Sequence, residues 1–291
     1  MSVDLLNALL ETRALQLAPA GEMFWYTSGT IGPYYINTHF LYGGQGPADE
    51  LLAFIDAGKG NRAVLARQLT ERVVGRYRED GLYASVVDAL VERARTAIGA
   101  DNIELVSGGE RRDWFFSAAV AHAMDRPHLM ISKEAELFLQ EGDDGRPVED
   151  LQGARTLHVA DLVTEASSYV RAWIPAIARA GGKLIQSVNV VDRGQGGIEA
   201  LRKMGVPSSA LLRVDEGLFG QLLTTGRIDQ AQAASLSAYY HDPHAAMSAF
   251  LLDHGDFLRA ALKSPQSSTA ARARLLVEQN PYDLDMEALT S

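Results

Sequence analysis

Short apolar segments alternate with helical patterns between residues 101 and 214, and this alternation constrains the fold more than any other feature of the chain. The expected strands are rich in aliphatic residues and lie at 103–106, 128–131, 156–159, 184–191 and 210–214. The expected helices between them lie at 113–124, 168–180 and 196–204. Alternation at this spacing implies right-handed crossovers and a parallel sheet. We therefore expect an α/β protein whose functional loops lie at the carboxyl ends of the strands.

Other helical patterns precede this region. Apolar residues recur at helical spacing in residues 1–17, 61–79 and 81–99. Two stretches are irregular: the glycine-containing residues 43–60 predict an inserted loop, and the charged residues 134–152 predict a long mobile loop.

The end of the chain has a different character. After about residue 226 only helical patterns remain, at 231–240, 245–262 and 269–278. We expect residues 226–291 to form a separate helical C-terminal extension.

Composition excludes several classes of function. The net charge of −10 disfavours nonspecific binding to nucleic acid or acidic membranes, because both need a basic surface. The chain has no cysteine, so disulfides and thiolate sites are excluded. It has no apolar stretch long enough for a membrane span, and its N-terminus lacks the pattern of a secretory signal. We expect a cytoplasmic protein with neither a nucleic-acid nor a membrane partner.

The segment from Thr156 to Ser168 is the strongest candidate for chemistry. It is an expected strand that ends at Asp161 and enters a helix through small and hydroxyl residues. Backbone N–H groups at such a turn can hold a phosphate, while the carboxylate binds ribose hydroxyls or magnesium. Asp161 and Thr164 are equally suited to capping a helix.

This segment resembles the phosphoribosyl diphosphate (PRPP) motif of type I phosphoribosyltransferases. Three further stretches resemble orotate phosphoribosyltransferases, in the same order along the chain. The first contains Phe24, Ser28-Gly29 and Pro33-Tyr34-Tyr35. The second is Lys133-Glu134, and the third is Asp192-Arg193, which precedes a glycine-rich turn. The resemblance covers residues 1–225. It implies a type I phosphoribosyltransferase-like domain there, with a hood in residues 1–42, the insert 43–60 and a twisted parallel sheet flanked by helices.

The resemblance also implies roles for individual residues. Lys133 and Asp161 are the expected catalytic residues. The expected substrate-binding residues are Thr164, Ser167 and Ser168 for the ribose 5-phosphate, Arg111 and Arg112 for the pyrophosphate, Arg193 for the base carboxylate, and Tyr34 and Tyr35 for stacking on the base. The family implies Mg²⁺ as a cofactor, a phosphoribosyl or nucleotide ligand, and a homodimer. We assign no side chain as a metal ligand.

Some of these residues have simpler interpretations. Arg111 and Arg112 could be a solvated helix start, and Arg193 could form a structural ion pair with Asp192. Tyrosines on a hairpin such as Tyr34 often serve packing alone.

Several positions depart from the family pattern. The residues that stand where the family has an acid, a glycine, a cation or a proton donor are Ala160, Ala166, Ser132, Glu136, Phe138 and Thr27, and Glu165 adds a negative charge beside the expected phosphate. Loss of one such donor typically costs about 10²–10³ in rate. Three hypotheses follow: an orotate-type transferase, a non-catalytic homologue that binds a nucleotide-like ligand or serves as a scaffold, and a transferase for another base.

Overall fold

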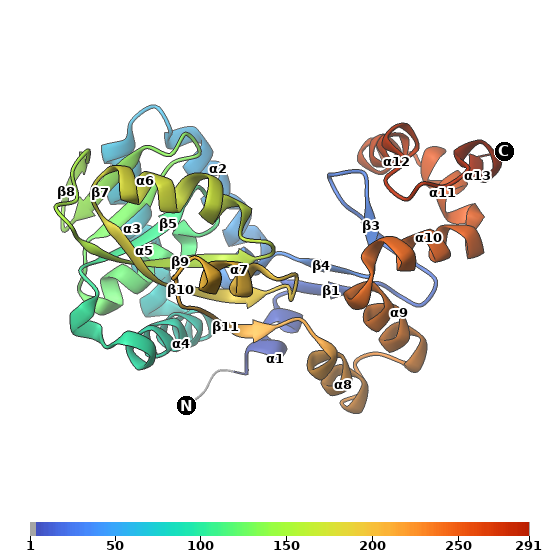
Figure 1. Cartoon of the computed structure of the whole chain (residues 1–291), viewed down its shortest axis with the longest axis horizontal. Helices are drawn as coiled ribbons and strands as arrows, with labels where there is room; N and C mark the ends of the chain where they lie inside the picture. Colours follow the sequence, from blue (N-terminus) through green and yellow to red (C-terminus); the bar gives the residue numbers. More distant parts are fainter. Residues whose placement is uncertain (1–3, 291) are drawn as a thin grey trace. The chain divides into compact units, whose positions relative to one another are not determined.

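The computed structural model describes residues 4–290 and divides into two compact units (Figure 1). The first unit comprises the chain up to Ala14 and Asn37–Arg213, and the second comprises Leu15–Ile36 and the chain from Val214 onward. This division differs from the expected segments 1–225 and 226–291. The expected hood is split, because its hairpin region packs with the C-terminal helices.

A seven-stranded sheet forms the centre of the first unit (Figure 1). Its order is β11-β10-β9-β5-β6-β7-β8. The strands are β5 (Leu105–Gly109), β6 (His128–Ile131), β7 (Leu137–Glu141), β8 (Asp144–Pro147), β9 (Arg155–Val163), β10 (Lys183–Asp192) and β11 (Ser208–Arg213). The first five strands in this order are parallel, while β7 and β8 pair antiparallel. The predicted α/β class with a mostly parallel sheet is confirmed.

Helices cover both faces of this sheet (Figure 1). One face is covered by α3 (Arg62–Glu79), α4 (Gly81–Ile98) and α5 (Trp114–Met124), and the other by the π-helix η3 (Tyr169–Trp173), α6 (Ile174–Arg179) and α7 (Gly197–Lys203). The remaining helical elements of this unit are α1 (Leu5–Glu11), η1 (Thr38–Tyr42), α2 (Gln45–Gly58) and η2 (Ala100–Asn102). Helix α5 is buried on nearly all sides because it contacts the sheet, α3 and α4, which explains its almost uniformly apolar sequence.

Two predicted loops are wrong. Residues 43–60 contain helix α2, whose buried side chains Ala48, Leu51 and Ile55 recur at helical spacing, so its glycines mark mainly the ends of a helix. Residues 134–152 contain the β7–β8 hairpin, in which Gly142 adopts a positive φ of 55° at the turn. The charged tips of this hairpin concealed its short apolar strand.

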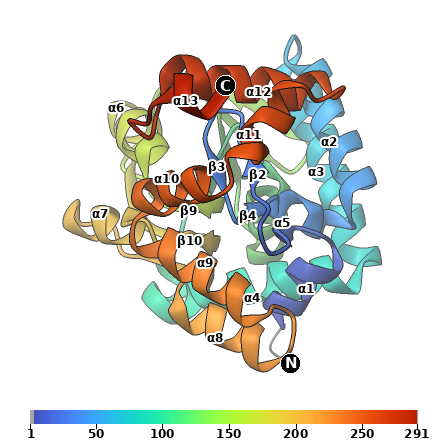
Figure 2. The same cartoon turned by 90° about the vertical axis from the view of Figure 1, so that its right-hand side faces the viewer.

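The second unit combines short strands with helices, which Figure 2 shows from another side. Its elements are β1 (Leu15–Leu17), β2 (Phe24–Trp25), β3 (Ile31–Gly32), β4 (Tyr34–Ile36), α8 (Glu216–Thr224), α9 (Gln230–His241), α10 (Pro243–Asp253), α11 (Gly255–Leu262), α12 (Ser267–Gln279) and α13 (Met286–Thr290). A hairpin forms here, but its strands differ from the expected ones: β2 pairs antiparallel with β3, whereas β4, which contains Tyr34 and Tyr35, pairs antiparallel with β1. The β2–β3 hairpin joins the helices through a stack of Trp25 on Phe257, with ring centroids 5.2 Å apart.

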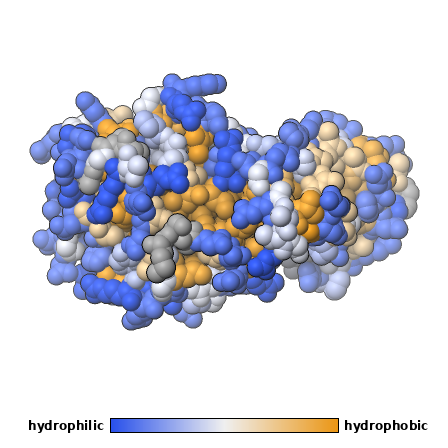
Figure 3. Space-filling model, turned by 90° about the horizontal axis from the view of Figure 1, so that it is seen from below, coloured by the Kyte–Doolittle hydropathy of each residue, from blue (hydrophilic) through white to orange (hydrophobic). Residues whose placement is uncertain are grey.

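On the face drawn in Figure 3, hydrophobic surface gathers in the middle of the view and hydrophilic residues surround it. Among the residues whose side chains the structure describes, the large hydrophobic ones that are exposed are Val64, Val170, Met204 and Leu252. Isolated apolar residues of this kind are ordinary on a protein surface. Within the same residues, no helix has the length and apolar character needed to cross a bilayer.

Candidate functional site

The loop after β9 forms a cavity at the carboxyl end of the sheet. Residues 162–169 and Trp173 line this cavity, which has a volume of about 290 Å³ and includes Thr164, Ser167 and Ser168. Ala166 has a φ of 60°, in the left-handed region that glycine adopts without a steric penalty. The chain therefore keeps a glycine-like turn here, although an alanine occupies it.

Buried aromatic contacts anchor the helix that follows this loop. The Tyr169 hydroxyl lies 2.6 Å from Ser187 Oγ and donates to Asn189 Oδ1 at 2.8 Å, both on β10. Trp173 stacks on His158 of β9, with ring centroids 4.4 Å apart. The start of this helix is thus fixed to two central strands, which holds the preceding loop in place.

The loop after β10 lies directly beside the loop after β9. The backbone N–H of Arg193 donates to Val163 O, and that of Gly197 donates to Thr164 O, both at 2.9 Å. A Cβ atom at Gly197 would lie only 2.5 Å from Thr164 O, so glycine permits this close approach. The backbone of Arg193 therefore lies beside the loop that lines the hydroxyl-containing cavity.

Asp161 occupies a different place from the expected one. It does not line the cavity, and its carboxylate is buried, where Oδ2 accepts a hydrogen bond of 2.7 Å from Thr38 Oγ1. Asp113 lies beside it: its Oδ1 accepts from the Asp161 backbone N–H, and its Oδ2 accepts from the Gly109 backbone N–H, both at 2.9 Å. The two carboxyl groups form a buried pair beneath the loop.

Burial determines the protonation of this pair. Burial, together with the negative charge of Asp113, raises the pKa of Asp161 from 3.8 to about 7. Burial also raises the pKa of Asp113 to about 6, against the stabilising hydrogen bonds from the backbone. The neighbouring His158 is neutral, because burial lowers its pKa to about 3. A shared proton between the two carboxyl groups is the chemical consequence.

Cations and acids meet at a second cavity near the ends of β5 and β6, with a volume of about 270 Å³. Lys59 Nζ lies 2.8 Å from Glu110 Oε1 and 3.1 Å from Asp56 Oδ1. Arg62 lies 2.5 Å from Glu136 Oε2. Every cation named here has a carboxylate partner, so an entering anion would have to compete with the protein's own acids.

The remaining predicted residues fall into three places. Arg111 is bound to Asp56, beside the second cavity. Lys133 is exposed just beyond β6, and its backbone N–H donates to Glu110 Oε2 at 3.1 Å. Arg112 lies near the buried acids. Its positive charge opposes, in small part, the rise in pKa that burial causes in both.

Tyr34 and Tyr35 belong to the second unit. Tyr34 is buried and makes an edge-to-face contact with Tyr239, with ring centroids 5.7 Å apart. Tyr35 contacts Phe24 and Tyr26. These contacts are packing contacts, in line with the simpler interpretation of this hairpin.

Sequence reasoning missed Lys59, Arg62 and Asp113. Lys59 and Arg62 come from the end of α2 and the start of α3, a region expected to be a loop. Asp113 was counted only as the start of a helix, because an acid directly before an apolar helix ordinarily caps it, whereas in the structure its side chain is buried and makes no cap hydrogen bond.

The expected magnesium does not fit these side chains. No cluster of three or more His, Asp or Glu residues within 4–290 is placed to hold a metal ion. Asp161, the one acid left of the family's pair, is buried and hydrogen-bonded to Thr38. A partly protonated, buried carboxyl group is a poor magnesium ligand.

The sequence comparisons identify relatives of one kind. No family model matches the chain. The chain is 33% identical over 131 residues to an orotate phosphoribosyltransferase of Methanoculleus marisnigri, which covers 45% of this chain and 75% of the relative. An orotate phosphoribosyltransferase of Sulfolobus acidocaldarius is 20% identical over 237 residues, covering 81% of this chain and 96% of the relative.

Solved structures share the fold. UMP synthase of Leishmania donovani matches with a TM-score of 0.54 at 18% identity, over 82% of this chain and 42% of that chain. Orotate phosphoribosyltransferase of Francisella tularensis matches with a TM-score of 0.53 at 12% identity, over 82% of this chain and 98% of that chain. The loops after β9 and β10 come in the order that the resemblance implied. Together with the match at 33% identity over 75% of the relative, they show that this chain belongs to the orotate phosphoribosyltransferase family.

Proposed function

We propose that this protein transfers the phosphoribosyl group of PRPP to orotate. The observation that carries the proposal is the hydroxyl-lined cavity after β9, whose turn keeps the left-handed conformation at Ala166. Backbone N–H groups and hydroxyls at such a turn suit the 5-phosphate of a sugar. Thr164, Ser167 and Ser168 are the groups that would bind it.

The transfer requires stabilisation of the leaving group. The bond from ribose C1 to the pyrophosphate oxygen breaks while a bond from C1 to the orotate ring nitrogen forms, and that nitrogen gives up its proton to water or to the departing pyrophosphate. Negative charge therefore develops on pyrophosphate. Lys133 and Arg111 follow the carboxyl ends of β6 and β5 and are the candidates to receive that charge. Preorganised cations at such a position are usually the largest contribution to catalysis.

Arg193 is the candidate for recognising the base. A guanidinium group binds a carboxylate through two parallel hydrogen bonds, and orotate carries one carboxylate. The backbone of Arg193 is fixed to β9 through Val163 O, next to the cavity. We propose that this geometry selects orotate over uncharged pyrimidines.

A second candidate function is nucleotide binding without turnover. The ion pairs of Lys59 and Arg62 favour it, because the local cations are already neutralised by Asp56, Glu110 and Glu136. Glu165 adds a further negative charge beside the phosphate cavity. Breaking these ion pairs would add to the cost of binding pyrophosphate.

One experiment separates the two functions. The consumption of orotate is followed in the presence of PRPP and magnesium at high protein concentration, and calorimetric titrations use PRPP, orotate and orotidine monophosphate. Turnover that is lost in Arg193→Ala and kept in the exposed control Arg202→Ala supports the transferase. Binding without turnover supports the second candidate, and the absence of both overturns the proposal. The expected homodimer remains a prediction, which sedimentation analysis can test.

A further inference from the structure

The order of the strands creates a switch point between β5 and β9. The chain continues from β5 to β6 on one side, whereas β9, β10 and β11 lie in turn on the other side. In open α/β sheets, ligands bind outside the carboxyl ends of the strands at such a point. The cavity after β9 borders it, because a Cβ atom on Gly109, the last residue of β5, would lie only 2.4 Å from Trp173 of that cavity.

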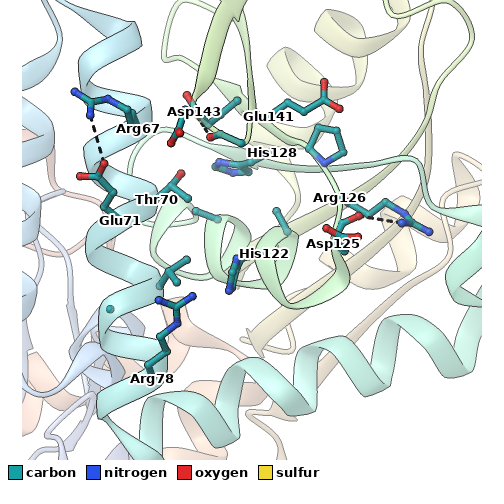
Figure 4. A pocket seen from close by; sticks show the side chains of 17 residues that line it. Arg67, Thr70, Glu71, Arg78, His122, Asp125, Arg126, His128, Glu141 and Asp143 are labelled. Atoms are coloured by element: carbon teal, nitrogen blue, oxygen red, sulfur yellow. Dashed lines mark hydrogen bonds and ion pairs between the residues drawn. The ribbon is translucent and has the colours of Figure 1, made fainter.

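A larger cavity of about 570 Å³ lies elsewhere in the first unit, around His128 (Figure 4). The cavity after β9 is smaller, at about 290 Å³. Among the charged side chains that Figure 4 labels, Arg67 and Glu71 already form an ion pair with each other at 3.5 Å. Because His128 is the first residue of β6, this larger cavity lies at the amino ends of the parallel strands. The sheet therefore favours the smaller cavity as the place for a ligand.

The hydrogen-bonded ladder between β5 and β9 ends before either strand does. The last residues that pair between them are Ser107 and His158. Beyond this point β5 stays paired with β6 up to Gly109, and β9 stays paired with β10 up to Val163. The two central strands therefore part from each other while each keeps its outer neighbour. Buried backbone N–H groups on the two facing edges then need an acceptor from outside the ladder.

The carboxylate of Asp113 lies in the gap between the parting strands. Its Oδ2 accepts from the Gly109 backbone N–H of β5, and its Oδ1 accepts from the Asp161 backbone N–H of β9, both at 2.9 Å. The residue is only 4% exposed. One side chain thus supplies both strand edges with the acceptor that the ladder no longer provides.

The start of α5 holds this carboxylate in place. An aspartate before a helix ordinarily accepts from the first N–H groups of that helix, whereas Asp113 makes no such hydrogen bond. Its neighbour Trp114 donates from Nε1 to Gly108 O at 2.9 Å. Two consecutive residues at the helix start are therefore bound to two consecutive residues of β5, Gly108 and Gly109.

We propose that Asp113 is a positioning residue, which fixes the spacing of the loops after β5 and β9 so that one PRPP molecule can bridge them. The inference rests on the proposed transfer from PRPP. That molecule carries its 5-phosphate and its pyrophosphate at opposite ends of one ribose. The groups proposed to bind them lie in different loops, with Thr164 and Ser167 after β9 and Arg111 after β5. A ligand that binds both loops depends on their separation, whereas a ligand that binds one loop does not.

Calorimetric titration of the full chain with PRPP, and with its two halves ribose 5-phosphate and pyrophosphate, tests the proposal. Asp113→Asn keeps the size of the side chain, but it offers one acceptor in place of two and turns a donor towards a backbone N–H. We expect this variant to bind PRPP at least about tenfold more weakly, while each half stays within about twofold of its wild-type affinity. Displacement of PRPP by each half gives the affinity of a half whose own heat signal is small.

Ser117→Ala is the matched control. Ser117 is a fully buried residue of the same helix, and its Oγ lies 2.8 Å from His128 Nε2 on β6. The substitution removes a buried hydrogen bond between α5 and the sheet that involves neither Gly109 nor Asp161. Destabilisation alone would affect both variants alike, so Ser117→Ala should keep the wild-type affinity for PRPP.

The outcomes separate this inference from the proposed function. If Asp113→Asn binds PRPP as the wild type does, or loses affinity for PRPP and for both halves equally, Asp113 does not set the spacing, and the transferase proposal is unaffected. An equal loss of PRPP affinity in Ser117→Ala would also overturn the positioning role. A wild-type protein that binds neither PRPP nor either half would overturn the proposed function, and the role of Asp113 with it.

Discussion

The buried carboxyl pair of Asp113 and Asp161 should make the protein less stable as the pH rises, and the substitution Asp161→Asn should weaken this dependence. Asp161 has a raised pKa in the folded protein, so it favours folding below its unfolded value of 3.8, and that contribution is lost as pH rises through about 7. Asparagine resembles the protonated form: its oxygen still accepts from Thr38 and its amide can donate to Asp113. When the pH rises from 4 to 8, the variant should therefore lose less stability than the wild type. The difference corresponds to the release of about one proton.

The structure gives an upper limit to the effect. A pKa displaced from 3.8 to about 7 corresponds to about 4 kcal/mol, since each pH unit is about 1.4 kcal/mol. Because Asp113 has a raised pKa as well, one proton serves both groups, and a smaller difference of about 2–3 kcal/mol is expected.

Urea denaturation followed by circular dichroism, at several pH values from about 4 to 8, measures the difference. Asp143→Asn, at an exposed acid in the turn of the β7–β8 hairpin, is the control and should follow the wild type. If Asp161→Asn shows the same pH dependence as the wild type, or is the less stable protein at pH 8, the assignment of a shared buried proton is refuted.

Three further predictions concern the loops of the candidate site. Ala166→Gly should raise stability by up to about 1 kcal/mol in urea denaturation, because an alanine in the left-handed conformation costs about 1–2 kcal/mol. The greater chain entropy of glycine in the unfolded state offsets part of this gain. A less stable variant would contradict the strain. Gly197→Ala should lower stability by about 1–3 kcal/mol and weaken PRPP binding in calorimetry, because its Cβ would lie 2.5 Å from Thr164 O. Unchanged stability and unchanged PRPP affinity would refute the close approach. Lys133→Ala should lower kcat about 10²–10³-fold in the orotate assay with an unchanged melting temperature, because its side chain is exposed; an unchanged kcat would remove Lys133 from the pyrophosphate site.

The parallel sheet could be predicted from the sequence because its strands are short, apolar and regularly spaced. The β6 strand was placed at its observed bounds, His128–Ile131, and the helices α3 and α4 were found within a residue or two. Periodicity failed where glycine or charge dominated the local composition. In α2 the buried residues Leu51 and Ile55 carried the helical signal, but the flanking glycines suggested a loop.

The candidate site was only partly predictable for a different reason. Thr164, Ser167 and Ser168 follow one strand directly, so their common location follows from local sequence. The partners of Asp161 do not: Thr38 is 123 residues away and Asp113 is 48 residues away. The orientation of a side chain between distant segments depends on tertiary packing, which one sequence without an alignment does not reveal.

The second unit is assembled from the two ends of the chain, and this has a consequence for biosynthesis. The backbone N–H of Ile31 donates to the Tyr282 hydroxyl, a contact between residues 251 positions apart. A nascent chain that has just emerged with its first hairpin must wait for nearly all the remaining residues before that hairpin finds its helices, so this part forms last during translation. A message truncated near its end would leave the short strand edges of the hairpin uncovered, and such edges promote aggregation.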